Sequence, residues 1–323
     1  MPFPMRFILV CTLSLLIGCV GPRPGSPAPR TGDEIVVCGR MFHTGAPVVL
    51  WTDPGGYDAY RVECRFAPDK TLPAGAGKNA TPNRYGSFRR NLPPDVDAEV
   101  KRDGWRLDEL TKYVDLFVMH YDVCGTSRRC FQVLQDDRGL SVHFMLDVDG
   151  TIYQTLDLKE RAWHAGSAND RSIGIEIANM GAYADAATLA KWYKPDGGGV
   201  VFNPPPTKGA TGIRTAGFVA RPARPRPITG PIHGKTLVQY DLTNAQYQSL
   251  SRLVAAIGRV FPRIRLDAPR GPDGMVRMDL LTADELAHFN GLIGHYHLTK
   301  DKTDPGPAFD WDRVIRSAKS AAR

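Results

Sequence analysis

The segment GLIGHYHLTKDKTDPGPAFDW, residues 291–311, decides the fold because it joins a buried strand to a polar loop. Leu292 and Ile293 form a short apolar run, which indicates the end of a buried strand. The Asp-Pro-Gly-Pro run that begins at Asp304 continues neither a strand nor a helix, because proline lacks a backbone N–H group. The polar residues between these points are therefore expected on a loop at the edge of a hydrophobic core.

Two segments upstream predict strands that bring polar side chains to the same edge. Residues 113–120, YVDLFVMH, are almost continuously apolar, as is typical of a central strand covered on both faces, and they end at His120. In residues 172–179, SIGIEIAN, alternate isoleucines share one face, and this turns Glu176 to the other. Imidazoles, carboxylates and an amine from three distant segments are thus expected in one small volume.

This combination of side chains suits a catalytic zinc ion. A hydrolytic zinc site uses three protein ligands and keeps a fourth position open for water. His120, His295 and Asp304 are the predicted ligands. If the strand continued past His295, His297 would point to the same side, and the spacing alone does not decide between these two histidines.

Glu176 and Lys302 would supply the chemistry around such an ion. Glu176 would take the proton from the water and pass it to a leaving amine. Lys302, two residues before Asp304, would stabilise the oxyanion formed on the carbonyl. A single histidine at a strand end is more often an ordinary hydrogen-bonded group, so the prediction depends on the whole set.

The first residues predict export. Residues 7–18, FILVCTLSLLIG, form an apolar stretch that is short for a bilayer span but typical of a signal-peptide core. The sequence LIGC, ending at Cys19, resembles the lipobox of bacterial lipoproteins, whose cysteine is lipidated after cleavage; the alternatives are an ordinary signal peptide or an uncleaved anchor. Residues 1–18 are then the signal peptide, and residues 19–34 are the lipidated cysteine and a Pro- and Gly-rich tether. Val20 favours sorting to the outer membrane, facing the periplasm.

Four cysteines remain outside the targeting segment. In an oxidising compartment an even number favours disulfides, and sequence order suggests Cys38 with Cys64 and Cys124 with Cys130, one of three pairings. A four-cysteine zinc site is the competing interpretation, but it requires C-x2-C pairs, which are absent.

The charge of the chain does not indicate a nucleic-acid partner. The formal net charge is +7, but the basic residues are scattered, and no basic stripe interleaved with aromatic residues is present. In an exported protein, affinity for anionic envelope polymers or lipid phosphates explains this charge more simply.

The 323 residues allow one large domain or two smaller ones. Residues 35–66 contain three short β-like runs and form a small β region, either a separate module or an extension of the main domain. Residues 67–95 are predicted to be a linker, and residues 96–317 the main domain. Within it, residues 180–241 carry GGG and PPP runs and are predicted to be an insertion, either a lid or a surface excursion.

Local patterns place further elements in the main domain. Residues 141–157 alternate around a tight turn, which predicts a hairpin. Residues 242–261 predict a helix that begins with a capping box of Thr243 and Gln246. A second capping box at Thr282 predicts a shorter helix.

Six motifs in this order resemble the zinc-dependent N-acetylmuramoyl-L-alanine amidases, a family that includes muropeptide amidases, phage endolysins and peptidoglycan recognition proteins. The motifs are VMH at His120, VHFMLDVDGTIYQ, AWHAG at His164, SIGIEIAN at Glu176, the TNAQYQSL helix and GHYHLTKDKTDPGPAFDW. They cover residues 113–312 and leave out the N-terminal β region. The resemblance implies an α/β fold, a mixed central β-sheet flanked by helices, here with a small N-terminal β extension, and a groove for a glycan-peptide substrate.

The resemblance also assigns the site. It selects His295 over His297, so that the residues matching the family's zinc ligands are His120, His295 and Asp304. Glu176 matches the catalytic acid/base and Lys302 the lysine that stabilises the transition state. His164 is expected to line the substrate groove, with Trp163 beside it.

Two details distinguish branches of the family. An aspartate as the third ligand makes the chain more similar to the bacterial muropeptide amidases. The pair Cys124 and Cys130 is similar to the disulfide that follows the first histidine in the recognition proteins.

The expected function is hydrolysis, by zinc-activated water, of the amide between the lactyl group of N-acetylmuramic acid and L-alanine in peptidoglycan or muropeptides. One alternative is a peptidoglycan-binding protein without activity, but the family members of that kind lack zinc ligands that this chain retains. The other is a zinc peptidase acting on the stem peptide. Nothing in the sequence indicates an oligomeric state.

Overall fold

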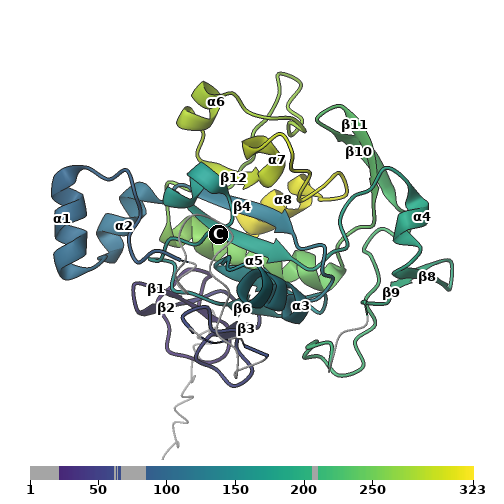
Figure 1. Cartoon of the computed structure of the whole chain (residues 1–323), viewed down its shortest axis with the longest axis horizontal. Coiled ribbons are helices and arrows are strands. Elements are labelled where there is room, and N and C mark those ends of the chain that lie inside the picture. Colours follow the sequence, from purple (N-terminus) through teal and green to yellow (C-terminus); the bar gives the residue numbers. More distant parts are fainter. Residues whose placement is uncertain (1–21, 62, 64, 67–84, 206–209) are drawn as a thin grey trace, which may run out of the picture.

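The computed structural model describes residues 22–61, 63, 65–66, 85–205 and 210–323 (Figure 1). A six-stranded sheet of order β12-β4-β7-β5-β6-β3 lies at its centre. Its strands are β3 (Val48–Leu50), β4 (Leu116–Tyr121), β5 (Phe144–Leu146), β6 (Ile152–Gln154), β7 (Ser172–Ile177) and β12 (Gly291–Gly294). Strands β5 and β6 pair antiparallel, and the other neighbours pair parallel. The predicted mixed sheet is confirmed.

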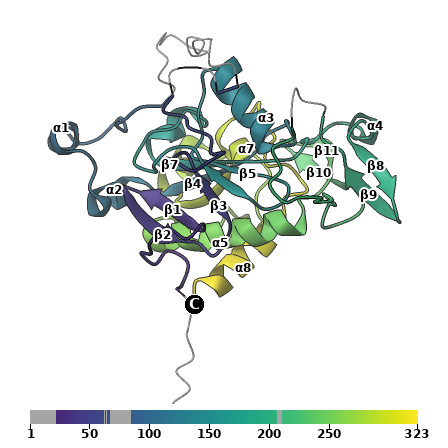
Figure 2. The same ribbon diagram turned by 90° about the horizontal axis from the view of Figure 1, so that it is seen from below.

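Helices flank the sheet on both faces, and three two-stranded hairpins lie around it (Figures 1 and 2). The helices are α1 (Pro94–Asp103), α2 (Leu107–Tyr113), α3 (Ser127–Phe131), α4 (Ala186–Leu189), α5 (Asn244–Val260), α6 (Ala283–His288), α7 (His295–Leu298) and α8 (Trp311–Ala321). A π-helical turn (Gln132–Asp137) continues α3, and a 3-10 turn (Gly166–Asp170) precedes β7. The hairpins are β1 (Glu34–Val37) with β2 (Arg40–His43), β8 (Tyr193–Asp196) with β9 (Gly199–Phe202), and β10 (Ile228–Ile232) with β11 (Lys235–Gln239).

The side chains of β4 point alternately into the apolar core and toward the polar site on the other face of the sheet. Phe117 and Met119 are fully buried in the large apolar core that also contains the inner faces of α5 and α8. Since successive side chains of a strand point to opposite faces, His120 points away from these helices. Strand β7 has the same arrangement, with Ile175 in that core and Glu176 on the opposite face. The polar residues therefore gather on the face of the sheet that α5 and α8 do not cover.

The local predictions for the main domain are confirmed. The predicted hairpin is β5–β6. Helix α5 begins with the predicted capping box, in which the Thr243 side chain accepts a hydrogen bond from the Gln246 N–H group. Helix α6 begins with the second capping box, formed by Thr282 and Glu285.

The N-terminal β region is an extension of the main sheet. Strand β3 pairs in parallel with β6 and so forms the edge of the six-stranded sheet. The first and second predicted runs contain β1 and β3, whereas the third, residues 60–64, contains no strand within its described residues. Strand β2 lies between the first two runs and was not predicted.

Residues 22–34 are not the free tether that their composition predicts. The Gly25 N–H donates to the His43 carbonyl (2.6 Å), and the Ala28 N–H donates to the Met41 carbonyl (3.2 Å). A side chain at Gly25 would meet Arg259 of α5, so this segment packs closely on the helix. The proline- and glycine-rich sequence is compatible with packing because β2 supplies partners for its backbone groups.

The predicted insertion contains regular secondary structure in its described residues. Residues 180–241 contain α4 and the hairpins β8–β9 and β10–β11. A small apolar cluster that includes Leu189, Tyr193 and Phe202 packs against Met180 at the end of the main sheet. Its strands are hard to predict because they are short and because glycine or proline lies in or next to each of them.

Other predictions concern residues that the structure does not describe. The signal peptide (1–18), Cys19 and Cys64 lie outside the described residues. Among the residues that are described, no helix has both the length and the apolar character needed to cross a bilayer.

Of the predicted linker, residues 67–84 lie outside the described residues, and residues 85–95 pack on the domain through Arg89, which is only 1% exposed. Its guanidinium donates to the carbonyls of Asn169 and Ser172 (both 3.0 Å) and to those of Leu158 (3.0 Å) and Glu160 (3.1 Å). Burial lowers its pKa to about 10, so it remains charged at neutral pH. This single side chain holds together the loop between β6 and β7.

We expect Arg89→Met to lower the free energy of unfolding by about 3 kcal/mol, since several buried carbonyls would each lose a partner. Urea denaturation of the two proteins measures this difference. The neighbouring Arg90 is exposed, so Arg90→Met should change stability by no more than about 0.5 kcal/mol. Equal effects of the two substitutions would contradict the role given to Arg89.

Candidate active site

Three side chains from distant parts of the chain converge at the end of β4. The Nδ1 atoms of His120 and His295 lie 3.0 Å apart. Oδ2 of Asp304 lies 2.7 Å from the first of these atoms and 3.0 Å from the second. All three residues are buried, and together they form a group with metal-ligating geometry. The structure thus brings together the three predicted ligands.

The position of His295 differs in one respect from the prediction. Strand β12 ends at Gly294, and His295 begins the single turn of α7 instead of closing the strand. This turn sends His297 elsewhere: its Nδ1 accepts from the Gly294 N–H (2.9 Å), and its Nε2 lies 2.8 Å from the Arg277 carbonyl. Because the strand ends before His295, the two histidines do not point to the same side, and only His295 lies beside His120 and Asp304.

The surroundings set the charges of these groups. Burial lowers the pKa of His120 to about 4, and the neighbouring His295 adds to the effect. Burial acts to raise the pKa of Asp304, but its hydrogen bonds with His120 and His295 outweigh burial and hold this pKa below the ordinary range. At neutral pH the site therefore contains a neutral His120 and an ionised Asp304.

The donor atoms fit a zinc ion. Tetrahedral zinc with nitrogen and oxygen ligands at about 2.0–2.1 Å separates its ligand atoms by about 3.3 Å. The three atoms would have to move apart by only a few tenths of an ångström. The second nitrogen of His120, Nε2, lies 3.0 Å from Nδ1 of His164, so this contact fixes the orientation of the His120 ring.

Glu176 lies beside the three donors. It is the register partner of His120 on the adjacent strand β7, and both line one pocket of about 290 Å³. Its Oε2 is buried and has no hydrogen-bond partner among the described residues. Burial, followed by the negative charges of Asp304 and Asp122, raises the pKa of Glu176 well above its ordinary range.

Lys302 lines the same pocket from the loop that carries Asp304. Hydrogen bonds from several elements hold this loop in place. Thr303 bonds through its hydroxyl to Tyr121, and Nε2 of His233, at the tip of β10–β11, lies 3.1 Å from the Lys302 carbonyl. Gln239 of β11 donates to the Pro305 carbonyl (3.0 Å). The insertion thus supports the catalytic loop, which the sequence did not indicate.

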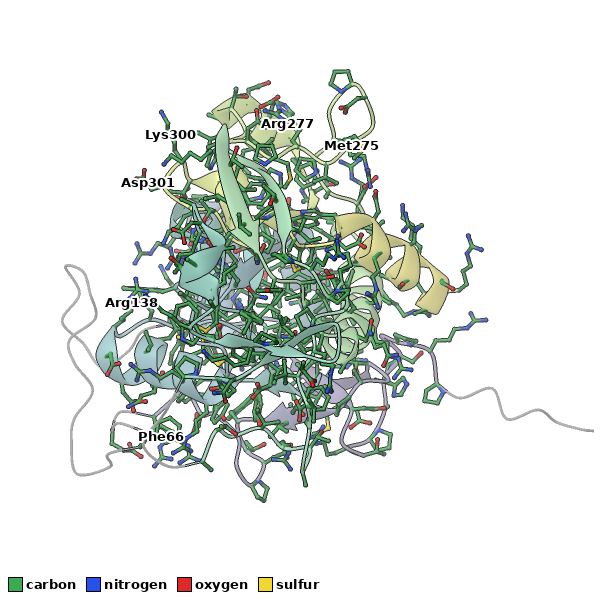
Figure 3. All side chains as sticks on the ribbon, turned by 90° about the vertical axis from the view of Figure 1, so that its right-hand side faces the viewer. Phe66, Arg138, Met275, Arg277, Lys300 and Asp301 are labelled. Carbon is green, nitrogen blue, oxygen red and sulfur yellow. The ribbon has the colours of Figure 1, made fainter. Side chains whose placement is uncertain are left out.

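His164 and Trp163 lie where two pockets meet. Both residues line the 290 Å³ pocket and also a neighbouring one of about 480 Å³. Nε2 of His164 lies 3.3 Å from the Ser172 hydroxyl, so both of its nitrogens have protein partners. The indole N–H of Trp163 has none among the described residues. The two pockets together form a groove past the three donors, and Arg138 and Asp301 lie at its rim (Figure 3).

Two residues in the groove, Asp122 and Val123, were not predicted. Asp122 is half-buried, and its Oδ1 accepts from the N–H groups of Cys124 (2.9 Å), Gly125 (3.0 Å) and Asn179 (3.1 Å). This arrangement ties the end of β4 to the end of β7 and holds Val123 at φ +54°, a conformation that branched side chains rarely adopt. No sequence pattern marks either residue.

The cysteines Cys124 and Cys130 line the same pocket. Both carry free thiols in the structure, as does Cys38, so the predicted Cys124–Cys130 disulfide is not seen. The two thiols contact each other, and burial raises the pKa of Cys130 well above its ordinary range. The predicted partner of Cys38, Cys64, lies outside the described residues.

Comparison with known proteins agrees with this site. A profile of the N-acetylmuramoyl-L-alanine amidase family matches residues 110–307, more than half of the chain and the part that contains all three donors. The chain belongs to this amidase family. N-acetylmuramoyl-L-alanine amidase XlyA of Bacillus subtilis is 47% identical over 62 residues, 17% of this chain and 20% of that protein. The 1,6-anhydro-N-acetylmuramyl-L-alanine amidase AmpD of Haemophilus influenzae is 24% identical over 181 residues, 56% of this chain and 59% of that protein.

The chain therefore spans less than two thirds of the length of these two amidases. Solved structures of the amidase family are also similar to it. A selenomethionine derivative of AmpD matches with 19% identity and a TM-score of 0.34, over 72% of this chain and 89% of that one. AmiD from E. coli, in complex with anhydro-N-acetylmuramic acid-L-Ala-D-gamma-Glu-L-Lys, matches with 19% identity and a TM-score of 0.36, over 64% of this chain and 57% of that one.

We expect His295→Ala to remove most of the zinc from the purified protein, because only two of the three donors would remain. Metal content by mass spectrometry, compared with the unchanged chain, measures this loss. The matched control is His297→Gln, whose side chain points away from the donors and which should keep zinc near the normal level. Loss of zinc in the control alone would show that the wrong histidine has been assigned.

Proposed function

We propose that this protein is a zinc-dependent N-acetylmuramoyl-L-alanine amidase that hydrolyses the bond between the lactyl group and L-alanine in peptidoglycan or muropeptides. The observation that carries the proposal is the convergence of His120, His295 and Asp304 beside the unpartnered carboxylate oxygen of Glu176. The proteins it resembles by sequence are named as amidases of this bond type.

His120, His295 and Asp304 would hold the zinc ion. When bound, zinc would supply Lewis-acid activation of water and of the substrate carbonyl. A neutral His120 and an ionised Asp304 are the forms that coordinate a metal, so the site needs no large change of protonation.

Glu176 would transfer the proton. Its carboxylate takes a proton from the attacking water as the carbon–oxygen bond forms, and it returns this proton to the nitrogen of L-alanine as the carbon–nitrogen bond breaks. A raised pKa suits a group that must both accept and donate a proton near neutral pH. The products are the lactyl carboxylate and a peptide with a free N-terminal L-alanine.

Lys302 and the groove would bind and orient the substrate. Lys302 lines the same pocket, and its ammonium group would stabilise negative charge that develops on the carbonyl oxygen. Trp163 offers a half-buried ring whose N–H group has no partner in the described part of the chain, which suits contact with the sugar or the first peptide unit. His164, held between His120 and Ser172, would orient the first ligand from the floor of the groove.

We expect Glu176→Gln to lower turnover by about 10²- to 10⁴-fold while zinc content stays normal, because only the proton transfer is lost. Digests of purified peptidoglycan, analysed by mass spectrometry, should contain intact stem peptides that begin with L-alanine. These peptides should be missing from digests with the variant. Peptides cut within the stem would instead identify a peptidase, and zinc binding without any product would identify a binding protein.

We further propose that the protein is an exported lipoprotein of the cell envelope, anchored through Cys19 in the outer membrane and facing the periplasm. The apolar residues 7–18 followed by the LIGC sequence support this proposal. In that oxidising compartment the neighbouring thiols of Cys124 and Cys130 would be joined as a disulfide, and Cys38 would pair with Cys64.

Intact-mass measurement of the protein purified from membranes tests both statements. We expect a chain that begins at Cys19, carries an added lipid mass, and is lighter by two hydrogens for each disulfide before reduction. The variant Cys19→Ser should stay unprocessed and without lipid. A chain cut at another residue and free of lipid would show that the signal peptide is of the ordinary kind.

A further inference from the structure

The outer surface of α5 and α8 carries an unusual excess of positive charge. The two helices contain the five cations Arg252, Arg259, Arg313, Arg316 and Lys319 and a single carboxylate, Asp312. Asp312 is paired with Arg270 of a neighbouring loop at 2.8 Å. We call the exposed surface formed by these two helices and residues 22–25 the basic face.

Two acidic groups near this surface each have a polar partner. Oδ1 of Asp33, the carboxylate close to the start of the described chain, lies 2.9 Å from Nδ1 of His43. Asp310 is engaged as the N-cap of α8 and accepts from the Arg313 N–H. Arg316 and Lys319 are exposed and have no ion-pair partner within the described part of the chain, so their charges face solvent.

The start of the described chain lies on this same face. Gly25 packs against Arg259, and the guanidinium of Arg259 donates to the Ala322 carbonyl at the end of α8 (3.0 Å). Arg23, two residues earlier, is exposed and adds a further cation. The chain thus enters the domain beside the ends of both helices.

The covalent distance from this point to the proposed anchor is short. Three peptide units join Cys19 to Pro22, and a fully extended chain covers at most about 3.6 Å per residue, which gives roughly 11 Å. Because residues 22–34 are packed on β2 and α5, they add no free length. The attraction of a basic residue to an anionic membrane extends over about one Debye length, roughly 8–10 Å. A lipid on Cys19 would therefore hold the basic face within reach of the headgroups.

We propose that the basic face docks on a phospholipid bilayer that contains anionic headgroups and so fixes the orientation of the enzyme. This inference rests on the proposed lipid anchor at Cys19. The active-site groove lies on the opposite face of the sheet, and in Figure 3 the labelled Arg138, Lys300 and Asp301 lie on the side away from α8 (yellow). Docking through α5 and α8 therefore turns the groove away from the membrane and toward the wall.

Lys319 and Lys300 form a matched pair of reporters for this orientation. Lys319 lies on the basic face, whereas Lys300 is exposed on the loop beside the groove. The full lipidated chain is reconstituted into vesicles of phosphatidylcholine alone or with about a third phosphatidylglycerol and treated briefly with a water-soluble amine reagent. We expect labelling of Lys319 to fall several-fold in the anionic vesicles and labelling of Lys300 to stay constant. High salt should restore the labelling of Lys319.

Charge-reversal variants test whether protection of Lys319 depends on the basic face or only on the net charge of the protein. The double variant Arg23→Glu with Arg316→Glu should abolish the protection of Lys319 in anionic vesicles. The matched control, Lys101→Glu with Arg102→Glu, changes the net charge equally but on α1, away from α5 and α8, and should leave the protection intact. Equal loss of protection in both variants would overturn the proposal.

Vesicle flotation tests the lipid anchor at Cys19 separately from docking of the basic face. Flotation with both kinds of vesicle but equal labelling of Lys319 would support the anchor and overturn docking. Flotation with anionic vesicles alone would support docking and overturn the anchor, and flotation with neither would overturn both. Protection of Lys319 by soluble wall fragments without vesicles would show that the partner is a wall polymer instead of a bilayer.

Discussion

The parallel pairing of β4 with β7 on one side and with β12 on the other is the constraint on which the site depends. In this register His120 lies directly beside Glu176, and Met119 lies beside Gly294. One further step along the chain brings His295 next to His120. Three parallel strands that end together therefore place two imidazoles and a carboxylate side by side. A shift of one residue in either pairing would turn these side chains to the opposite face, into the core beneath α5 and α8.

Asp304 reaches the same place only through a loop, and the surrounding structure compensates for the mobility that loops usually have. Tyr121 at the end of β4, Gln239 of β11 and His233 at the hairpin tip each bond to this loop. Gln239 is itself buried and also bonds to Asn179 after β7 (3.1 Å). The insertion thus links the ends of two central strands to the catalytic loop. An element that looks optional in the sequence contributes to the precision of the site.

The parts of the molecule that follow local rules could be predicted, and those that depend on distant contacts could not. Alternating isoleucines fix the orientation of Glu176, and a capping box fixes the start of α5, because both patterns act within a few residues. Arg89 shows the opposite case: its burial depends on carbonyls about 70–80 residues away, and no feature of its neighbours reveals this. For His297 the deciding fact was a helical turn, which the apolar run before it does not encode.

The electrostatics of the site indicate how it avoids the cost of burying charge. A single ionised carboxylate, Asp304, is shared by two imidazoles, and the buried carboxyl groups behind it, Glu176 and Asp122, have raised pKa values, to about 7 for Asp122. Few negative charges are therefore present together in this site. A divalent cation would reverse this balance, since its charge favours the ionised form of every carboxyl group nearby. Beside such a cation the ionised form of Glu176, which is the form that can accept a proton from water, would therefore be favoured.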